Sequence, residues 1–260
     1  MARTVFITGA SSGIGEAAAR AFAEEGYRLV IAGRRHERLK TLKRELEADF
    51  AAEILVLSFD IRDRFQCEAA VESMPEEFAD IDILVNNAGL AAGLERIDEG
   101  DPMDWDAMID TNIKGLLYVT RVIANKMIQR GAGHIVNIGS IAGTQPYPDG
   151  GVYCGTKHAV HALSQSMRMD FLGFGVKVTE IRPGMAETEF SLVRFHGDQE
   201  AADEVYSGIT PLTGDDVADA ILWAVQQPAH VNISEIVITP QQQANAYCVS
   251  RGKREENGGE

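Results

Sequence analysis

The feature of this sequence that most constrains its fold is a regular alternation of short apolar runs with longer amphipathic segments. Strand-like and helix-like segments that follow one another in turn favour a parallel sheet with helices on both faces. The strands are predicted at residues 4–8, 28–32, 54–59, 81–85, 134–138, 176–181 and 236–239, and the helices at 14–25, 37–49, 63–74, 104–130, 152–172 and 215–227. The sequence therefore predicts an α/β fold with a doubly wound, Rossmann-type parallel sheet of about seven strands.

We expect all of these strands and helices to belong to a single domain. A chain of 260 residues is long enough for one large α/β domain with a sizeable core. The sequence shows no internal repeat, no low-complexity linker and no break in composition that would mark a second domain. We therefore assign residues 1–240 to one domain and the polar residues 241–260 to a C-terminal tail, whose last ten residues we expect to be mobile.

Charge and cysteine content exclude several classes of function. The formal net charge of −15 at pH 7 argues against binding to nucleic acid or to an anionic membrane surface. No apolar run approaches the roughly 20 residues that span a bilayer, and we expect no signal peptide because residues 5–7 already read as a strand. Cys67, Cys154 and Cys248 have neither paired nor metal-ligand spacing, which indicates a reducing cytoplasm.

A glycine-rich turn joins the first predicted strand to the first predicted helix. It reads Thr8-Gly9-Ala-Ser-Ser-Gly13-Ile-Gly15, a variant of the dinucleotide fingerprint Gly-x-Gly-x-x-Gly in the same structural place. Glycines let the backbone approach a ligand, and the helix N-terminus offers free N–H groups to a pyrophosphate. Many strand-to-helix turns need glycine for geometry alone, so the turn by itself leaves a nucleotide site and a structural turn about equally open.

Two arginines follow the second predicted strand. Arg34 and Arg35 stand there, and no acidic residue occurs between Arg28 and His36. An NAD site usually offers a carboxylate at this place for the ribose 2′-hydroxyl, whereas arginine suits the 2′-phosphate of NADP. The alternative is that both arginines are simply solvated. Together with the glycine turn, they predict NADP as the cofactor.

A tyrosine and a lysine stand four residues apart in a predicted helix. Tyr153 and Lys157 would share one helix face, and a neighbouring ammonium can lower the pKa of a phenol toward the operating pH. Ser140, thirteen residues before Tyr153, could reach the same oxygen from a strand end. The alternative is a surface pair, because Tyr-x-x-x-Lys is common by chance.

These motifs together resemble the short-chain dehydrogenase/reductase family over about residues 3–240. Several independent motifs match that family in order and spacing. They are Thr8-Gly9-x-x-x-Gly13-x-Gly15, Asn86-Asn87-Ala88-Gly89, Asn112, Ser140, Tyr153-x-x-x-Lys157 and Pro183-Gly184-x-x-x-Thr188.

The resemblance implies a role for each matching residue. Tyr153 would donate or accept the proton at the substrate oxygen, and Ser140 would hydrogen-bond that oxygen. Lys157 would lower the pKa of Tyr153 and hold the nicotinamide ribose, while Asn112 would bend its helix and hold a water that links Lys157 to solvent. Further cofactor contacts are expected at Gly9, Ser11, Ser12, Gly13, Ile14, Gly15, Asp60, Ile61, Asn87, Gly89, Pro183, Gly184 and Thr188. A helix cap or a turn remains the structural alternative for the asparagines.

Residues 86–93, 189–198 and 228–233 resemble a narrower group, the NADP-dependent serine and 3-hydroxy acid dehydrogenases. This implies oxidation of a small 3-hydroxy acid of the serine, allo-threonine or 3-hydroxypropanoate type, or the reverse reduction. Arg182 departs from the pattern and leaves the substrate open. The alternatives are a reductase of another small aldehyde or ketone, such as sulfoacetaldehyde, a broad carbonyl reductase, and a non-catalytic NADP-binding sensor.

Arg194 is the candidate for recognising the acid group of the substrate. It lies ten residues past Gly184, in a segment that folds over the nicotinamide in this family. An arginine fork fits a carboxylate or a sulfonate. The alternative is a surface arginine that pairs with an acidic neighbour: Glu187, Glu189 or Asp198.

The remaining expectations concern metals, thiols and assembly. His134, His158 and His161 lack metal-ligand partners at useful spacing, so we predict no metal. Cys154 is interpreted as a packing residue. The resemblance implies a homotetramer in which the helices near 104–130 and 152–172 supply the larger interface.

Overall fold

Seven parallel strands form one sheet in the computed structural model, which describes residues 2–252. Their order across the described sheet is β3-β2-β1-β4-β5-β6-β7. The strands are β1 (Thr4–Thr8), β2 (Arg28–Gly33), β3 (Ile54–Ser58), β4 (Ile83–Asn86), β5 (Gly133–Ile138), β6 (Val176–Pro183) and β7 (Glu235–Ile238). The predicted doubly wound parallel sheet is therefore confirmed.

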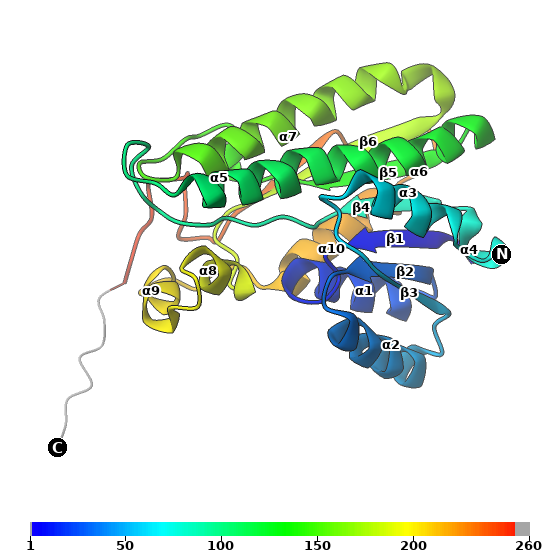
Figure 1. Ribbon diagram of the computed structural model, residues 1–260, viewed down its shortest axis with the longest axis horizontal. Helices are drawn as coiled ribbons and strands as arrows, with labels where there is room; N and C mark the ends of the chain where they lie inside the picture. The colour runs from blue at the N-terminus through cyan, green and yellow to red at the C-terminus, as the bar shows by residue number, and fades with distance from the viewer. Residues whose placement is uncertain (1, 253–260) are drawn as a thin grey trace.

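Helices cover both faces of this sheet (Figure 1). One face carries α1 (Gly13–Glu24), α2 (His36–Phe50) and α10 (Gly214–Val225). The other carries α3 (Arg64–Glu72), α4 (Glu76–Ala79), α6 (Leu116–Arg130) and α7 (Gly151–Asp170), with α5 (Pro102–Ile109) packed on α7. Each side of the sheet is thus shielded from solvent, as parallel sheets require.

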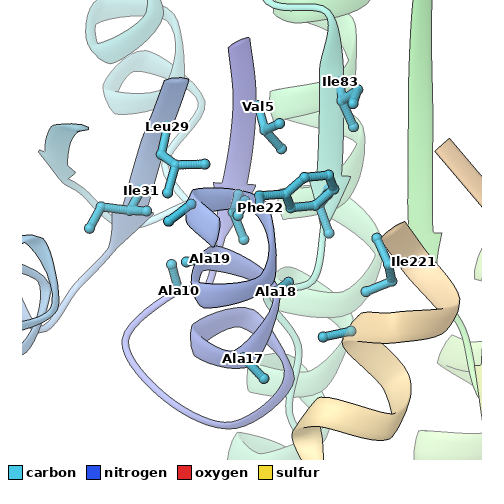
Figure 2. Close-up of a cluster of buried hydrophobic side chains, with 14 of the residues drawn as sticks. Val5, Ala10, Ala17, Ala18, Ala19, Phe22, Leu29, Ile31, Ile83 and Ile221 are labelled. Atoms are coloured by element: carbon cyan, nitrogen blue, oxygen red, sulfur yellow. The ribbon is translucent and has the colours of Figure 1, made fainter. Parts of the chain in front are cut away.

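Alternating side chains of each central strand enter two separate cores. Val5 and Ile7 of β1 pack toward α1, and Figure 2 shows Val5 on this face together with Phe22 of α1 and Ile221 of α10. Phe6, between them, joins the core on the opposite face. Because successive side chains of a strand point to opposite faces, a strand buried on both faces reads as an uninterrupted apolar run.

The order in which successive strands are added to the sheet reverses between β1 and β4. β1 pairs with β2 on one side and with β4 on the other, so the loops after β1 and β4 diverge at the carboxyl edge. Ligands of doubly wound sheets bind in the crevice at such a switch point. The loops that follow Thr8 and Asn86 border this crevice.

The helix predicted over 104–130 is interrupted. A π-helical turn, η1 (Asp110–Gly115), separates α5 from α6. The short helices α8 (Glu189–Arg194) and α9 (Gln199–Glu204) were not predicted, because six residues are too few to show a helical period.

Part of the predicted tail is folded. Gln243 is buried, and its Oε1 accepts a hydrogen bond of 2.8 Å from the N–H of Met185. The N–H of Ala246 donates to Gln145 over 3.0 Å. Residues 241–252 therefore pack on the domain, whereas residues 253–260 of the predicted mobile segment lie outside the described residues. Within residues 2–252, no helix is long and apolar enough to cross a bilayer.

Candidate active site

A cavity of about 670 Å³ opens at the carboxyl edge of the sheet. Most of the predicted site residues line it. They are Gly9, Ser11, Ser12, Gly13, Ile14, Arg34, Arg35, Asp60, Ile61, Asn87, Gly89, Ser140, Tyr153, Lys157, Pro183, Gly184, Thr188 and Arg194. Gly15 and Asn112 do not line the cavity, so the structure places them in supporting positions instead.

The glycine turn is shaped by its packing against Asn87. Gly9 has a φ of +67°, and a Cβ built on it would lie 2.9 Å from the Asn87 side chain. The Asn87 amide donates hydrogen bonds to the carbonyls of Thr8 (2.9 Å) and Gly9 (3.2 Å). A Cβ on Gly15 would lie 2.3 Å from the same amide nitrogen. The absence of a side chain at Gly15 therefore leaves room for this amide, and its contact with the cofactor stays a prediction.

Arg35 is held against the turn that leads into α1. Its Nε donates to Ser11 over 3.0 Å, and its Nη2 donates to Ser12 over 2.5 Å. Ser12 is the residue before α1 and makes no side-chain cap hydrogen bond, so it does not block the N–H groups of the helix start. The turn thus presents free N–H donors and a fixed cation side by side.

Glu189 of α8 bridges two arginines of this region. It accepts a hydrogen bond of 2.6 Å from Arg35 and one of 2.5 Å from Arg38. Burial favours the neutral acid, but the two guanidinium groups outweigh it and lower the pKa of Glu189 to about 2. Neither Arg38 nor this bridge was predicted, because the partners are separated by about 150 residues in the sequence. Arg34 also lines the cavity, and it forms no ion pair with any residue between 2 and 252.

Tyr153, Lys157 and Ser140 converge at the other end of the cavity. The two α7 residues are buried, and a side-chain hydrogen bond joins Ser140 to Tyr153. The Nζ of Lys157 donates to the carbonyl of Ile138 over 2.8 Å and lies 5.9 Å from the centre of the Tyr153 ring. The structure therefore brings together the three residues that the motif predicted.

The pKa of Tyr153 differs from the sequence expectation. Burial and the nearby Tyr147 raise it above its ordinary value, while Arg194 and the hydrogen bond with Ser140 act in the opposite direction. Burial also lowers the pKa of Lys157 to about 8. Lys157 was expected to lower the pKa of Tyr153, but its ammonium points to the Ile138 carbonyl, and desolvation of the phenol dominates.

Asn112 does not line the cavity but links the segment after β4 to α7. It lies in the π-helical turn η1, where its Nδ2 donates to Leu90 over 2.8 Å and to Thr156 over 3.0 Å. Its Oδ1 accepts from the N–H of Leu90 over 2.9 Å. The expected bend is thus a π-helical turn, which is often found near functional sites. The carbonyl oxygen also lies near Gly89, where a Cβ would be 3.2 Å from it.

Arg194 lies over the ring of Tyr153. Its guanidinium carbon is 5.0 Å from the centre of that ring and 5.1 Å from that of Phe190. Its Nη2 donates to the hydroxyl of Tyr147 over 2.8 Å, whereas its buried Nε has no hydrogen-bond partner.

No ion pair joins Arg194 to an acidic residue within the described part of the chain. The three carboxylates proposed as its partners were Glu187, Glu189 and Asp198; Glu189 pairs instead with Arg35 and Arg38. Arg182 does not line the cavity, and its Nη2 contacts Glu235 over 2.7 Å. The structure therefore makes Arg194 available to an anion in the cavity, whereas Arg182 lies outside it.

Sequence reasoning missed several residues that line the cavity. Tyr147 and Phe190 flank Arg194, and the folded C-terminal residues Gln243, Tyr247 and Arg251 also line the cavity. Tyr147 stands in the loop before Tyr153, which was a usable signal. The apolar and aromatic residues within the polar C-terminal segment were another.

The histidines and Cys154 have structural surroundings. His134 is buried and contacts Thr179 over 2.7 Å. His161 has spatial partners that its sequence spacing concealed, because ligand atoms of His161, Glu180 and Glu235 lie within 4.8 Å of one another. The absence of a metal stays a prediction. Cys154 is buried, and burial raises the pKa of its thiol, as expected for a packing residue.

Comparison with known proteins identifies the family of this site. The family model described as short chain dehydrogenase matches residues 3–198. The NADP-dependent 3-hydroxy acid dehydrogenase YdfG of Salmonella typhi is 46% identical over 243 residues, which cover 93% of this chain and 96% of that protein. Sulfoacetaldehyde reductase 2 of Chromohalobacter salexigens is 46% identical over 253 residues, which cover 96% of this chain and 100% of that protein. The closed form of a serine dehydrogenase complexed with NADP⁺ superposes with a TM-score of 0.89 at 42% identity, covering 96% of this chain and 100% of the other. This chain therefore belongs to the short-chain dehydrogenase family.

Proposed function

We propose that this protein is an NADP-dependent oxidoreductase that interconverts a small 3-hydroxy acid and its carbonyl form by hydride transfer. The observation that carries the substrate class is Arg194, which lies above Tyr153 with an unpartnered buried Nε and no carboxylate partner among residues 2–252. The names of two relatives support an anionic substrate, because a 3-hydroxy acid carries a carboxylate and sulfoacetaldehyde carries a sulfonate.

The chain's own residues fit NADP. The start of α1 is uncapped by Ser12, and the glycine turn lines the cavity with Gly9 and Gly13, which both adopt positive φ. Arg34 and Arg35 border the same cavity and suit a 2′-phosphate. When bound, the cofactor supplies the hydride acceptor in its oxidised form and the hydride donor in its reduced form.

Proton transfer is assigned to Tyr153. In the oxidation, the substrate carbon loses a hydride, and the hydroxyl proton passes to the Tyr153 phenolate; in the reduction, the phenol returns a proton to the carbonyl oxygen. Ser140 hydrogen-bonds that oxygen, and Lys157 supplies a positive charge beside the ring. Because burial raises the pKa of Tyr153, its phenol is protonated at neutral pH, which is the form that serves the reduction.

Substrate orientation is assigned to Arg194. Its guanidinium is fixed by Tyr147 and by the Phe190 and Tyr153 rings, so little side-chain entropy remains to be lost on binding. A carboxylate bound to Arg194 would hold the rest of a small substrate beside Tyr153, because the guanidinium carbon lies 5.0 Å from the centre of that ring. This geometry favours a short 3-hydroxy acid over a long or neutral alcohol.

A substrate panel tests the proposal. Serine, allo-threonine, 3-hydroxypropanoate and a neutral alcohol of similar size are offered with NADP⁺ and with NAD⁺, and sulfoacetaldehyde and a neutral ketone are offered with NADPH. Turnover of the hydroxy acids with NADP⁺ supports the proposal. Turnover confined to neutral ketones would favour a broad carbonyl reductase, and NADPH binding without turnover of any compound would favour a sensor.

Assembly and location are further proposals. We infer a homotetramer from the family, with α5, α6 and α7 supplying the larger interface. The three cysteines are all free, and Cys67 and Cys154 are buried, which suits a reducing cytoplasm.

A further inference from the structure

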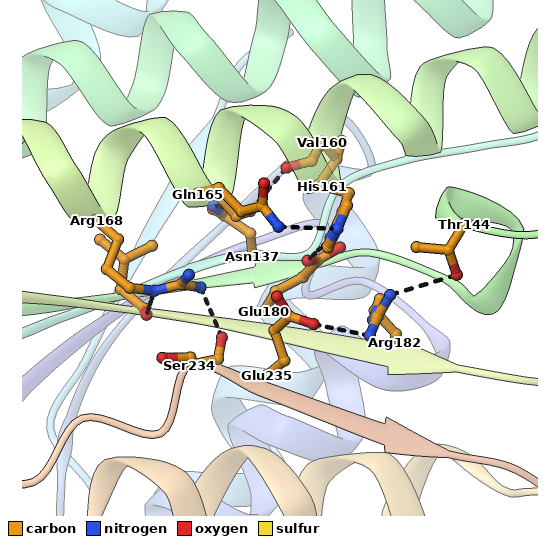
Figure 3. Close-up of polar contacts among 12 residues, drawn as sticks. Asn137, Thr144, Val160, His161, Gln165, Arg168, Glu180, Arg182, Ser234 and Glu235 are labelled. Carbon is orange, nitrogen blue, oxygen red and sulfur yellow. Dashed lines mark hydrogen bonds and ion pairs between the residues drawn. The ribbon is translucent and has the colours of Figure 1, made fainter.

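A second polar cluster lies behind the candidate active site and outside its cavity. It consists of His161, Glu180, Arg182 and Glu235, which Figure 3 shows between α7 and the strands β6 and β7. The Glu180 side chain is 0% exposed. A carboxylate so deeply buried is costly unless a partner compensates its charge, so its presence requires a reason.

Glu180 is held by a residue on the catalytic face of α7. Tyr153, Lys157 and His161 follow one another at intervals of four residues, so they share one side of the helix. The Nδ1 of His161 lies 2.7 Å from Oε2 of Glu180, and Gln165 Nε2 lies 3.1 Å from the other ring nitrogen. Because the Gln165 amide donates to Nε2, we assign the His161 proton to Nδ1, where it is donated to Glu180.

The other oxygen of Glu180 faces the turn that carries Ser140. Oε1 has no hydrogen-bond partner, and a Cβ on Gly139 would lie 2.3 Å from it. Gly139 stands between Ser140 and Ile138, and the carbonyl of Ile138 accepts the hydrogen bond from Lys157. The carboxylate therefore lies against the short segment that positions both Ser140 and Lys157.

We propose that Glu180, held in place by His161, is a positioning residue whose carboxylate keeps Lys157 in its ammonium form and braces the turn of Ser140. This inference rests on the roles that the proposed function gives to Lys157 and Ser140. The two effects have separate physical origins in one fully buried side chain: the negative charge of Glu180 acts on Lys157, and its close contact with Gly139 braces the turn.

The sign of the electrostatic effect follows from the groups around Glu180. Burial lowers the pKa of Lys157 to about 8, and the charge of Glu180 opposes that decrease. Burial raises the pKa of Glu180, while His161 and Arg182 oppose the rise and Glu235 adds to it. Removing the Glu180 charge therefore lowers the pKa of Lys157 further, and its ammonium is lost at lower pH.

The direct test is a titration of Lys157 in the full-length protein. Lysine labelled with ¹³C at Cε is followed by NMR, and the Lys157 signal is assigned by its loss in Lys157→Arg. In Glu180→Gln we expect the pKa of Lys157 to fall by about one pH unit, the lower end of the effect of a nearby opposite charge. The alkaline limb of the pH profile of kcat for carbonyl reduction should move to lower pH by a similar amount.

Glu235→Gln is the matched control. It removes the same charge from the same cluster, but Glu235 pairs with Arg182, and the three atoms nearest to a Cβ on Gly139 all belong to Glu180. We expect little change in the pKa of Lys157 in Glu235→Gln. His161→Leu is a second variant: loss of the imidazole favours the neutral form of Glu180, so the pKa of Lys157 should fall as in Glu180→Gln.

Three outcomes would overturn the inference. They are an unchanged Lys157 pKa in Glu180→Gln and His161→Leu, an equal shift in Glu235→Gln, and a loss of kcat that is uniform across pH with the Lys157 titration intact. The titration does not require turnover, so an enzyme inactive on every hydroxy acid would contradict the proposed function while the Lys157 titration still decided this inference.

Discussion

Truncation of Arg194 is the most informative test of substrate recognition. In Arg194→Ala, the charged donor above Tyr153 is removed, while the hydroxyl of Tyr147 loses its 2.8 Å partner. A hydrogen bond to a charged group contributes about 1.5–3 kcal/mol, which corresponds to roughly 10- to 150-fold in kcat/KM. We expect a decrease of that size for an anionic hydroxy acid, with most of the effect in KM.

The assay compares two substrates in the same variants. Steady-state kinetics are measured by nicotinamide absorbance with an anionic hydroxy acid and with a neutral alcohol or aldehyde of similar size. Tyr147→Phe serves as the control, because it removes the hydroxyl that orients Arg194 but leaves the guanidinium in place. We expect a smaller loss in Tyr147→Phe than in Arg194→Ala for the anionic substrate.

Anion recognition and side-chain packing by Arg194 lead to different kinetic outcomes. Arg194 also packs on the rings of Tyr153 and Phe190, so a purely structural role would impair both substrates alike. An equal loss for the charged and the neutral substrate, or no loss for either, would show that Arg194 is not the anion site.

Three further predictions concern the cofactor, pH and assembly. The double variant Arg34→Asp, Arg35→Ala should lose most of a preference for NADP(H) over NAD(H) of about 10- to 150-fold in kcat/KM, and equal use of both cofactors by the wild type would refute that assignment. Burial lowers the pKa of His134 from 6.5 to about 3, so only the unfolded state binds this proton between these pH values and stability falls as the pH falls. At pH 5 this lowers the free energy of unfolding by about 2 kcal/mol. In urea unfolding, the free energy of unfolding of His134→Gln should therefore depend less on pH between 7 and 5 than that of the wild type. Equal pH dependences in the two proteins would contradict this prediction. Light scattering at micromolar concentration should give the mass of a tetramer, and a monomer would refute the inferred assembly.

Local patterns were sufficient to predict the elements that hold the site. Strand β1 spans Thr4–Thr8 as expected, and the turn after it carries the glycines in the predicted place. Both features depend on residues adjacent in sequence, namely an apolar run and a turn that requires positive φ at Gly9. The same holds for Tyr153 and Lys157, which one helix brings together.

The rest could not be predicted because it depends on contacts between distant segments. The π-helical turn at Asn112 is accompanied by bonds to Leu90 and Thr156, which no local period reveals. Glu189 pairs with Arg35 and not with Arg194, and this pairing could not be predicted because Glu189 lies 154 residues from Arg35 in the sequence.

The direction of the Tyr153 pKa is a related case. The spacing suggested that Lys157 controls it, yet burial dominates in the folded chain, and Arg194 is the charge that most opposes burial. Neither the degree of burial nor the position of Arg194 can be read from the local sequence.

The most direct test of the central claim is the turnover of Tyr153→Phe. This substitution keeps the ring that packs against Phe190 and removes only the oxygen that is assigned to proton transfer. Turnover of the best hydroxy acid is followed by NADPH absorbance, and NADPH binding is measured by fluorescence in the same preparation. We predict that kcat falls by at least about 10²-fold while NADPH binding stays nearly intact. Substantial residual turnover in Tyr153→Phe would contradict the account.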